Sequence, residues 1–172
     1  MPWLTRRQGG VCRLNIEPGL ALMRRFAPRV ATWNAQPDLY TLLLAGTVAL
    51  GVGWNGRGRM IAQANPGTLS AVIPREGSVA QINTLNLTAR APAGDLAQAF
   101  IDHALSADVQ AAFAAKAYYG PVNSQVILPD ALKLAISGPP DVAAKAMQLD
   151  WRFVSAHYSE WVRRIQREVI SG

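Results

Sequence analysis

The sequence of 172 residues predicts an α/β fold, because short apolar runs bounded by glycines come before and between stretches with helical periodicity. Half of the residues are hydrophobic and only 16% are charged, which favours a packed core over disorder. The length suits one domain or a portion of a two-lobed protein. With one cysteine, Cys12, the chain has neither an internal disulfide nor a cysteine-rich zinc site.

The first expected helix starts at Pro37 and Asp38 and stops at Gly46, a residue that commonly ends helices. The following run, TVALGVGW (47–54), is expected to be a buried strand because it is short and mostly apolar. A short helix over RMIAQAN is expected next. Two further strands are expected over LSAVIP (69–74) and VAQINTLNLT (79–88).

Helical patterns dominate from Asp95 onward. DLAQAFIDHAL, with Asp95 as its cap, puts Leu96, Phe100, Ile101 and Leu105 on one side, and ADVQAAFAAKA follows with Ser106 as its cap. Two short helices begin at LPDAL and GPPDV, where proline suits the first turn. The last helix is expected over Ser155–Val169, with its apolar side chains together and RRIQRE in solvent.

The net charge of +6 is concentrated near the N-terminus. Six arginines and one glutamate lie in the first 29 residues, so five of the six net positive charges are there. The remaining basic residues are scattered and lack the aromatic interleaving of a nucleic-acid platform. No nucleic-acid partner is therefore expected. The arginines are followed by no apolar run, so this stretch is not expected to act as a secretory signal.

The segment GVGWNG, starting at Gly51, matches the spacing G-x-G-x-x-G of dinucleotide-binding loops. Such a loop must close a strand, open a long helix and precede a second strand that ends in an acid. Here the expected helix is short, and Glu76, 20 residues beyond Gly56, lies in the turn PREG. A nucleotide- or phosphate-binding α/β enzyme using this loop is the alternative reading. The glycines more naturally let the backbone bend so that Trp54 faces a cleft.

Five segments in order resemble the C-terminal half of bacterial periplasmic solute-binding proteins of ABC importers, most closely the spermidine/putrescine-binding branch. They are GTVALGVGWNGRG, VIPREGSVAQINTLNL, LAQAFIDHALSADVQAAFAAKAYYGPVNSQ, MQLDW and the Trp- and Arg-bearing last helix. The similarity covers nearly the whole chain from about Ala21. It implies a non-enzymatic, periplasmic protein that needs no cofactor, binds a small polar solute and delivers it to ABC permease subunits.

The resemblance also implies a fold of two α/β lobes that close on the solute, a type II-like arrangement of which this chain would be the C-terminal portion. Residues 20–78 and 129–172 would belong to the second lobe. Residues 79–128, with a crossing strand and the helix pair, would belong to the first, and 1–19 are an unassigned basic segment. Surface left uncovered by the absent part of the first lobe is expected to promote self-association.

The resemblance places five residues in the cleft. Trp54 matches a tryptophan that packs on the methylene chain of the ligand, and Tyr119 matches a tyrosine near the hinge, with Tyr118 as the competing candidate. Gln148 matches a glutamine that hydrogen-bonds a ligand nitrogen. Gln81 and Asn83 stand where polyamine binders have a tryptophan and an aspartate.

These departures bear on the ligand. A buried ammonium needs a carboxylate or several acceptors, and Asn83 brings an acceptor without charge. Arg57 would repel a cation, and the nearest acids are Glu76 and Asp150. A small polar or anionic solute, such as an amino-acid derivative, therefore stays open beside a polyamine.

The chain shows no catalytic or metal-binding motif. His103 and His157 are its two histidines, and neither stands in a nucleophile or zinc motif. Both are interpreted as solvated helix residues. The dispersed acids have no metal-ligand spacing, so no metal site is expected.

Overall fold

The computed structural model describes residues 4–6, 11–34 and 38–171, and for 4–6 and 11–14 it describes the backbone alone. The chain forms two compact units. Unit 1 comprises Met1–Asp38, Ser78–Gln81 and Ala146–Gly172, and unit 2 comprises Leu39–Gly77 and Ile82–Lys145. The chain therefore passes between the units four times. The expected lobe boundaries at 20–78, 79–128 and 129–172 remain a prediction.

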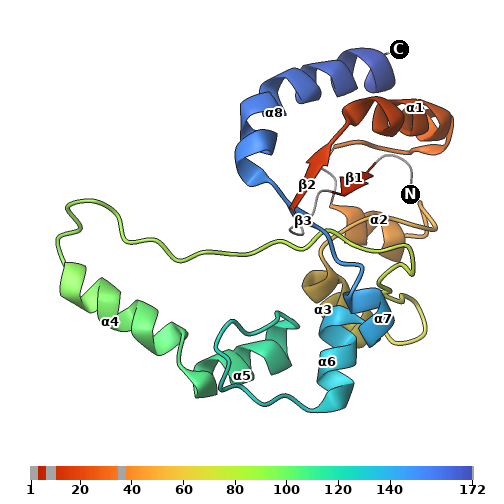
Figure 1. The fold of residues 1–172 in the computed structure, drawn as a ribbon. Coiled ribbons are helices and arrows are strands. Elements are labelled where there is room, and N and C mark those ends of the chain that lie inside the picture. The colour runs from red at the N-terminus through yellow and green to blue at the C-terminus, as the bar shows by residue number, and fades with distance from the viewer. Residues whose placement is uncertain (1–3, 7–10, 35–37, 172) are drawn as a thin grey trace. The chain divides into compact units, whose positions relative to one another are not determined.

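Unit 1 contains a small sheet with the order β1-β2-β3 (Figure 1). Strand β1 (Leu4–Arg6) pairs antiparallel with β2 (Val11–Leu14), and β2 pairs parallel with β3 (Gln148–Leu149). A separate parallel bridge joins Val79 to Met147. The segment that contains Met147 and β3 thus meets both β2 and Val79, which are far from it in sequence.

Two helical regions complete unit 1. Helix α1 (Ile16–Phe26) is capped by Asn15, whose side chain accepts a hydrogen bond from the Glu17 amide, and it continues into the 3₁₀ turn η1 (Ala27–Arg29). Helix α8 (Trp151–Ile165) continues into the π-helical turn η2 (Gln166–Ile170). The α1 region and the end of α8 lie side by side (Figure 1), and the buried residues Leu20 and Val169 come from them.

Unit 2 is helical throughout its regular structure. Its elements are α2 (Leu39–Leu44), α3 (Asn55–Ala64), α4 (Gly94–Ala104), α5 (Ala107–Ala117), α6 (Asp130–Ser137) and α7 (Pro140–Ala143). Helix α3 contacts both α5 and α6, and α6 contacts α7. Helix α5 also contacts α4, so the helix contacts of this unit run in the order α4, α5, α3, α6, α7.

The buried strand expected over 47–54 is wrong. Gly46, with φ at 68°, ends α2 as expected, but residues 47–54 then run without regular structure. Leu50 is 83% exposed and Val52 is 94% exposed. A strand forms only with a hydrogen-bonded neighbour, and the described residues provide none here, since 69–74 and 79–88 are also irregular apart from the Val79 bridge.

The helices from 94 onward follow the sequence more closely. Helices α4 to α7 form where they are expected, although Asp95 lies inside the first turn of α4 and Ala93 is its cap. Helix α8 begins at Trp151, four residues before the expected Ser155, because the Asp150 carboxylate caps it by accepting from the Phe153 amide at 3.0 Å. With three short strands in the described residues, regular structure is mostly helical.

Candidate functional site

The candidate site in unit 2 is built around the first turn of α3. Trp54 is the N-cap residue of this helix, and its extended backbone has φ at −74° and ψ at 129°. Its carbonyl oxygen accepts hydrogen bonds from the Gly58 amide at 2.9 Å and from the Tyr40 hydroxyl at 3.2 Å. Tyr40 is itself buried. The backbone of Trp54 is therefore held in place while its indole, with the residue 61% exposed, faces solvent.

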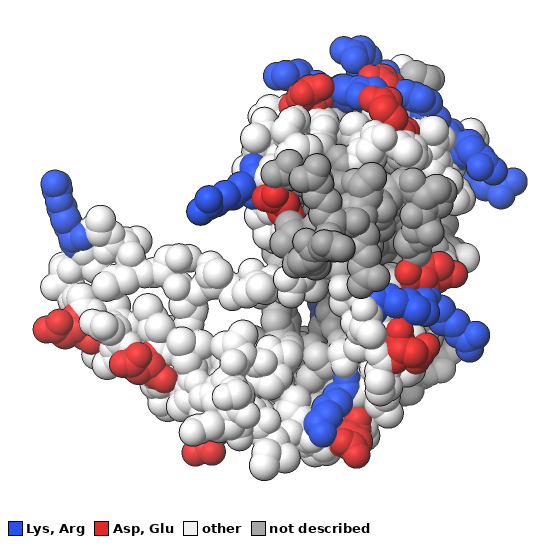
Figure 2. Space-filling view, viewed as in Figure 1, with Lys and Arg blue, Asp and Glu red and all other residues white. Residues whose placement is uncertain are grey.

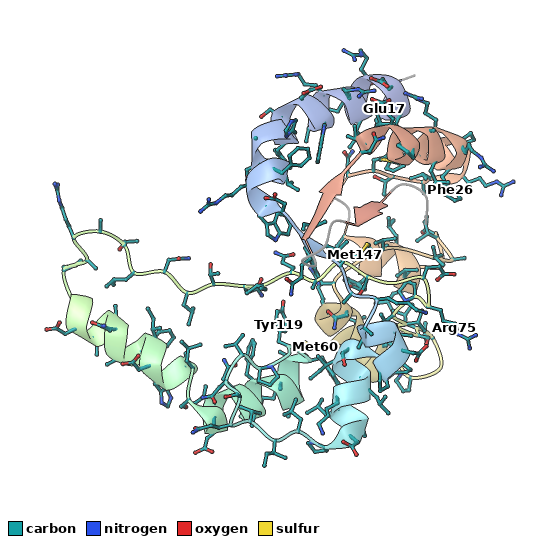
Figure 3. The ribbon with its side chains drawn as sticks, viewed as in Figure 1. Glu17, Phe26, Met60, Arg75, Tyr119 and Met147 are labelled. Carbon is teal, nitrogen blue, oxygen red and sulfur yellow. The ribbon has the colours of Figure 1, made fainter. Side chains whose placement is uncertain are left out.

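Gly56 allows the segment after α5 to approach α3 closely. A Cβ atom at position 56 would lie 2.5 Å from the carbonyl oxygen of Ala117 and 3.1 Å from the ring of Tyr119. The first distance is too short for any side chain, so only glycine fits there. This contact brings Tyr119 to the end of α3 at which Trp54 stands (Figure 3).

Polar contacts to α3 fix its position from two sides. The Asn55 side-chain amide donates to the carbonyl oxygen of Ile136 in α6 at 2.8 Å, and the Tyr118 hydroxyl donates to Oε1 of Gln63 at 2.9 Å. Tyr118 has φ at 58° and is half-buried, whereas Tyr119 is 41% exposed. Of the two tyrosines, Tyr118 therefore joins helices and Tyr119 offers its ring to solvent.

The aromatic surface at this site is extended by neighbouring rings. The ring centroids of Tyr119 and Phe113 are 5.4 Å apart, at an angle of 46°. The guanidinium of Arg57 lies 5.1 Å from the ring centroid of Tyr40, a cation–π distance. Exposed aromatic faces next to an ordered helix start can pack against an aliphatic or planar solute.

The remaining three expected site residues lie elsewhere. Asn83 is exposed in the irregular segment of unit 2, whereas Gln81 and Gln148 belong to unit 1. Near Gln148 the chain is held by the Met147 amide donating to Ser78 at 2.8 Å and by the Ala80 amide donating to Met147 at 2.9 Å. Unit 1 thus contains two of the five residues, and unit 2 contains three.

A parallel bridge orders the chain next to Gln148. Val79 is paired with Met147, so these two side chains point to one face of the ribbon. Gln148 follows Met147 directly and its side chain takes the other face. Gln81 lies two residues beyond Val79, where the chain has no regular structure.

The acids that could neutralise an ammonium have other positions. The Asp150 side chain caps α8, and Glu76 is exposed in the turn after Pro74. Among the described residues, no group of three or more His, Cys, Asp or Glu side chains is arranged to hold a metal ion. The described part of the candidate site thus presents aromatic faces and amides.

Charged side chains gather in unit 1, on the surface formed by α1 and the end of α8 (Figure 2). Arg164 pairs with Glu17, where one bond measures 3.1 Å, and with Glu168 at 2.8 Å. Glu168 also accepts from Arg167 at 3.1 Å and from Arg24. These five residues, Glu17, Arg24, Arg164, Arg167 and Glu168, form the ion network of unit 1.

The ion network shifts the pKa values of its members. The hydrogen bond from Arg164, followed by those from Arg167 and Arg24, lowers the pKa of Glu168 from its ordinary 4.5 to about 2. The hydrogen bond from Arg164 likewise lowers the pKa of Glu17, and the two carboxylates raise the pKa of Arg164. The expectation that RRIQRE lies in solvent is wrong for Arg164 and Glu168, whose side chains are 22% and 19% exposed.

The histidines differ from each other in their surroundings. His103 is exposed on α4, as expected for a solvated helix residue. His157 is half-buried, donates from Nδ1 to the Phe153 carbonyl oxygen at 2.8 Å, and stacks on Trp161 with ring centroids 5.6 Å apart. The interpretation of His157 as solvated is therefore wrong, because it packs within an aromatic row along α8.

Several residues of the site escaped the reading of the sequence. Tyr40 and Asn55 anchor the start of α3. Tyr40 belongs to no motif, and Asn55 lies in GVGWNG without having been assigned a role there. Gly56 was visible in GVGWNG, but its partner Ala117 is 61 positions away. Only the fold shows that the glycine serves a close helix approach.

The candidate site is thus an exposed aromatic surface at the ordered start of α3. Comparison with known families is more specific. Residues 13–144 match the family model described as bacterial extracellular solute-binding protein, and the chain belongs to this family. No curated protein and no solved structure gives a significant match.

Membership defines the general role of the chain. It is an extracellular solute-binding component of an ABC transporter, and it is not an enzyme, because this family is non-enzymatic. The nucleotide-binding alternative gains no support. GVGWNG does lead into a helix, α3, but the residues before it form no strand. None of the described helices has the length and apolarity needed to cross a membrane.

Proposed function

We propose that the chain binds a small polar solute of the polyamine type and delivers it to the permease subunits of an ABC importer in the periplasm. The exposed faces of Trp54 and Tyr119, brought to one end of α3 by Gly56, carry this proposal. A methylene chain with terminal nitrogens can pack on such rings, and cations are attracted to their faces. Within the same unit Asn83 supplies an amide oxygen. Gln81 and Gln148, in unit 1, stay candidates through the resemblance to polyamine binders.

The proposal includes the α/β two-lobed fold of type II-like binding proteins, of which this chain would be the C-terminal portion. In that fold affinity arises when two lobes close on the solute and exclude water. The chain passes from one unit to the other four times, which is consistent with crossing connections of this kind. The apolar surface on α4 fits a face that another lobe covers.

The charge of the solute distinguishes two classes of ligand. A polyamine needs carboxylates, and the Asp150 carboxylate is committed to the α8 cap. A small polar or anionic solute, such as an amino-acid derivative, stays the alternative within the same binding function. The two classes differ in net charge and can be separated by titration.

Ligand-observed NMR on the 172-residue chain provides the test, since one cleft wall alone gives weak binding. Each neutral hydrogen bond contributes about 0.5–1.5 kcal/mol, while association costs at least roughly 4 kcal/mol. Spermidine and putrescine are therefore expected to bind more weakly than about millimolar. Trp54→Ala should remove the signal, and His103→Ala should keep it. A signal from glutamate or its derivatives alone, lost in Trp54→Ala, would replace the polyamine. Equal signals in the two variants would refute the site.

A further inference from the structure

A pocket of about 370 Å³ lies at the C-terminal end of α1, and solute binding does not use it. Its lining combines two kinds of side chain, the guanidinium groups of Arg25 and Arg29 and the apolar groups of Leu22, Phe26 and Pro28. Leu22, Arg25 and Phe26 follow at helical spacing and so share one face of α1. Phe26 lies at the end of this helix (Figure 3) and is 53% exposed.

The two arginines of the pocket, Arg25 in α1 and Arg29 in η1, differ from Arg24 in their partners. Arg24 is paired with Glu168, and Glu168 and Glu17 are in turn held by Arg164. No described acid pairs with Arg25 or Arg29, because these nearby carboxylates are already taken up in the ion network. Two cations therefore remain at the edge of an apolar surface without a described counter-charge.

This combination of side chains selects a definite ligand chemistry. A guanidinium presents a planar fork that matches carboxylate and phosphate oxygens in a bidentate way. The ring of Phe26 and the side chains of Leu22 and Pro28 would gain from covering by an alkyl or aryl group. A nucleic-acid strand is a poorer fit, because its binding takes a longer row of cations and several stacking rings.

We propose that this pocket binds an oxyanion with an apolar tail, a carboxylate or phosphate monoester whose head lies between Arg25 and Arg29 and whose tail covers Phe26, Leu22 and Pro28. Such a head group can belong to a free amphiphile or to an acidic phospholipid. The chemistry recognised is the same in both cases.

Calorimetry with octyl phosphate tests the pocket, with inorganic phosphate and octanol as the two halves of the probe. Octyl phosphate, kept below its micelle concentration, should bind at least about tenfold more tightly than either half, because charge-assisted hydrogen bonds and apolar burial then act together. Added salt should weaken the binding. Equal affinity for inorganic phosphate and octyl phosphate would overturn the proposed binding of the tail by Phe26, Leu22 and Pro28.

Matched variants separate this pocket from general attraction to a basic protein. Arg25→Gln/Arg29→Gln should weaken octyl phosphate binding about tenfold or more. Arg152→Gln/Arg163→Gln removes the same charge from exposed positions on α8 and should change it less than twofold. Equal losses in the two double variants would overturn the proposal. Arg25→Lys/Arg29→Lys, which keeps the charge without the fork, should give an intermediate loss.

The source of the head group is settled by vesicles. If the anion is a lipid head group, the chain should sediment with phosphatidylglycerol vesicles and not with phosphatidylcholine vesicles. The Arg25→Gln/Arg29→Gln variant should no longer sediment with phosphatidylglycerol vesicles. Octyl phosphate binding without vesicle binding would instead assign the pocket to a free amphiphile. Trp54→Ala should leave both measurements unchanged, since Trp54 is not among the residues that line the pocket. Circular dichroism verifies that each variant is folded, and Phe26→Ala, which keeps every charge, should still weaken octyl phosphate several-fold.

Discussion

In unit 1 the α1 region and the end of α8 are joined by ion pairs. In unit 2 the helices are held by the close approach at Gly56 and by neutral hydrogen bonds from Asn55 and Tyr118. Glu17 and Arg164 are 147 positions apart and form an ion pair, and Arg24 meets Glu168 across 144 positions. In unit 2 the corresponding contact is Gly56 against the Ala117 carbonyl oxygen.

The two kinds of contact differ in which side chains they leave exposed at the surface. The ion network ties α1 to α8 with side chains that are then unavailable to a ligand. The contacts that hold α3 in unit 2 use Gly56 and the neutral side chains of Asn55 and Tyr118. Trp54 and Tyr119 stay 61% and 41% exposed. The comparison teaches that the helices of the two units are held by different contacts, ion pairs in one and a close glycine approach with neutral hydrogen bonds in the other, and it makes predictions for each unit.

The largest effect is expected from removing the close approach in unit 2. Gly56→Ala places a Cβ 2.5 Å from the Ala117 carbonyl oxygen, and such overpacking costs on the order of 1–3 kcal/mol of unfolding free energy. Thermal and denaturant unfolding measure the loss. Gly94→Ala is the matched control, because it is also a helical glycine of unit 2 and has nothing within 4 Å. A loss in Gly94→Ala as large as that in Gly56→Ala would break the comparison.

Self-association is expected to depend on an apolar groove between α4 and residues 85–87. This groove is lined by Leu85, Leu87, Leu96, Phe100 and Ile101 among others. Leu96 is 72% exposed and Phe100 is 61% exposed. Exposed apolar patches drive association, so the chain is expected to sediment as oligomers and Leu96→Lys/Phe100→Lys to shift it towards monomer. Ile127→Lys, at a position 90% exposed outside the groove, should not. A wild-type monomer in sedimentation would contradict this expectation.

A smaller, pH-dependent effect is expected from the ion network of unit 1. The folded pKa of Glu168 is lowered from 4.5 to about 2, so the unfolded state binds more protons in this range. The stabilisation by Glu168 is complete above pH 4.5 and is lost as pH falls through about 2. Glu17, whose pKa is also lowered, acts in the same direction.

Unfolding temperatures between pH 6 and 2 check this sign. The wild type should lose stability on acidification, and Glu168→Gln should be less stable near neutral pH with a flatter profile. Glu160→Gln, an exposed acid of the same helix, should keep the wild-type profile. A Glu168→Gln profile as steep as that of the wild type would show that the network does not govern acid stability.

The smallest effect is expected for the exposed pair of Asp130 and Lys133 at the start of α6. The hydrogen bond from Lys133, at 2.9 Å, lowers the pKa of Asp130. Both side chains are mostly exposed, and exposed pairs stabilise proteins little. Asp130→Asn should therefore unfold at nearly the wild-type temperature. A drop comparable with that of Gly56→Ala would mean that surface charge also supports unit 2.

The sequence by itself determined the local features. Gly46 ends α2, and proline, aspartate and serine near the starts of α5, α6 and α7 place those helices, because caps and first turns depend on residues a few positions apart. The order of the motifs was also enough to indicate the solute-binding family, to which the chain belongs. Trp54 and Tyr119 could be named as site candidates from their motifs alone.

Only the tertiary structure decided the contacts between distant residues. TVALGVGW has a strand composition, but a strand also needs a partner, and the described residues offer it none. RRIQRE reads as a solvated run, yet Arg164 and Glu168 are drawn into the network by Glu17 and Arg24 from the other end of the chain. Pairing of this kind depends on where the backbone brings the side chains, which local patterns do not contain. For the same physical reason, Gly56 could be found in the sequence, but its role required the position of Ala117.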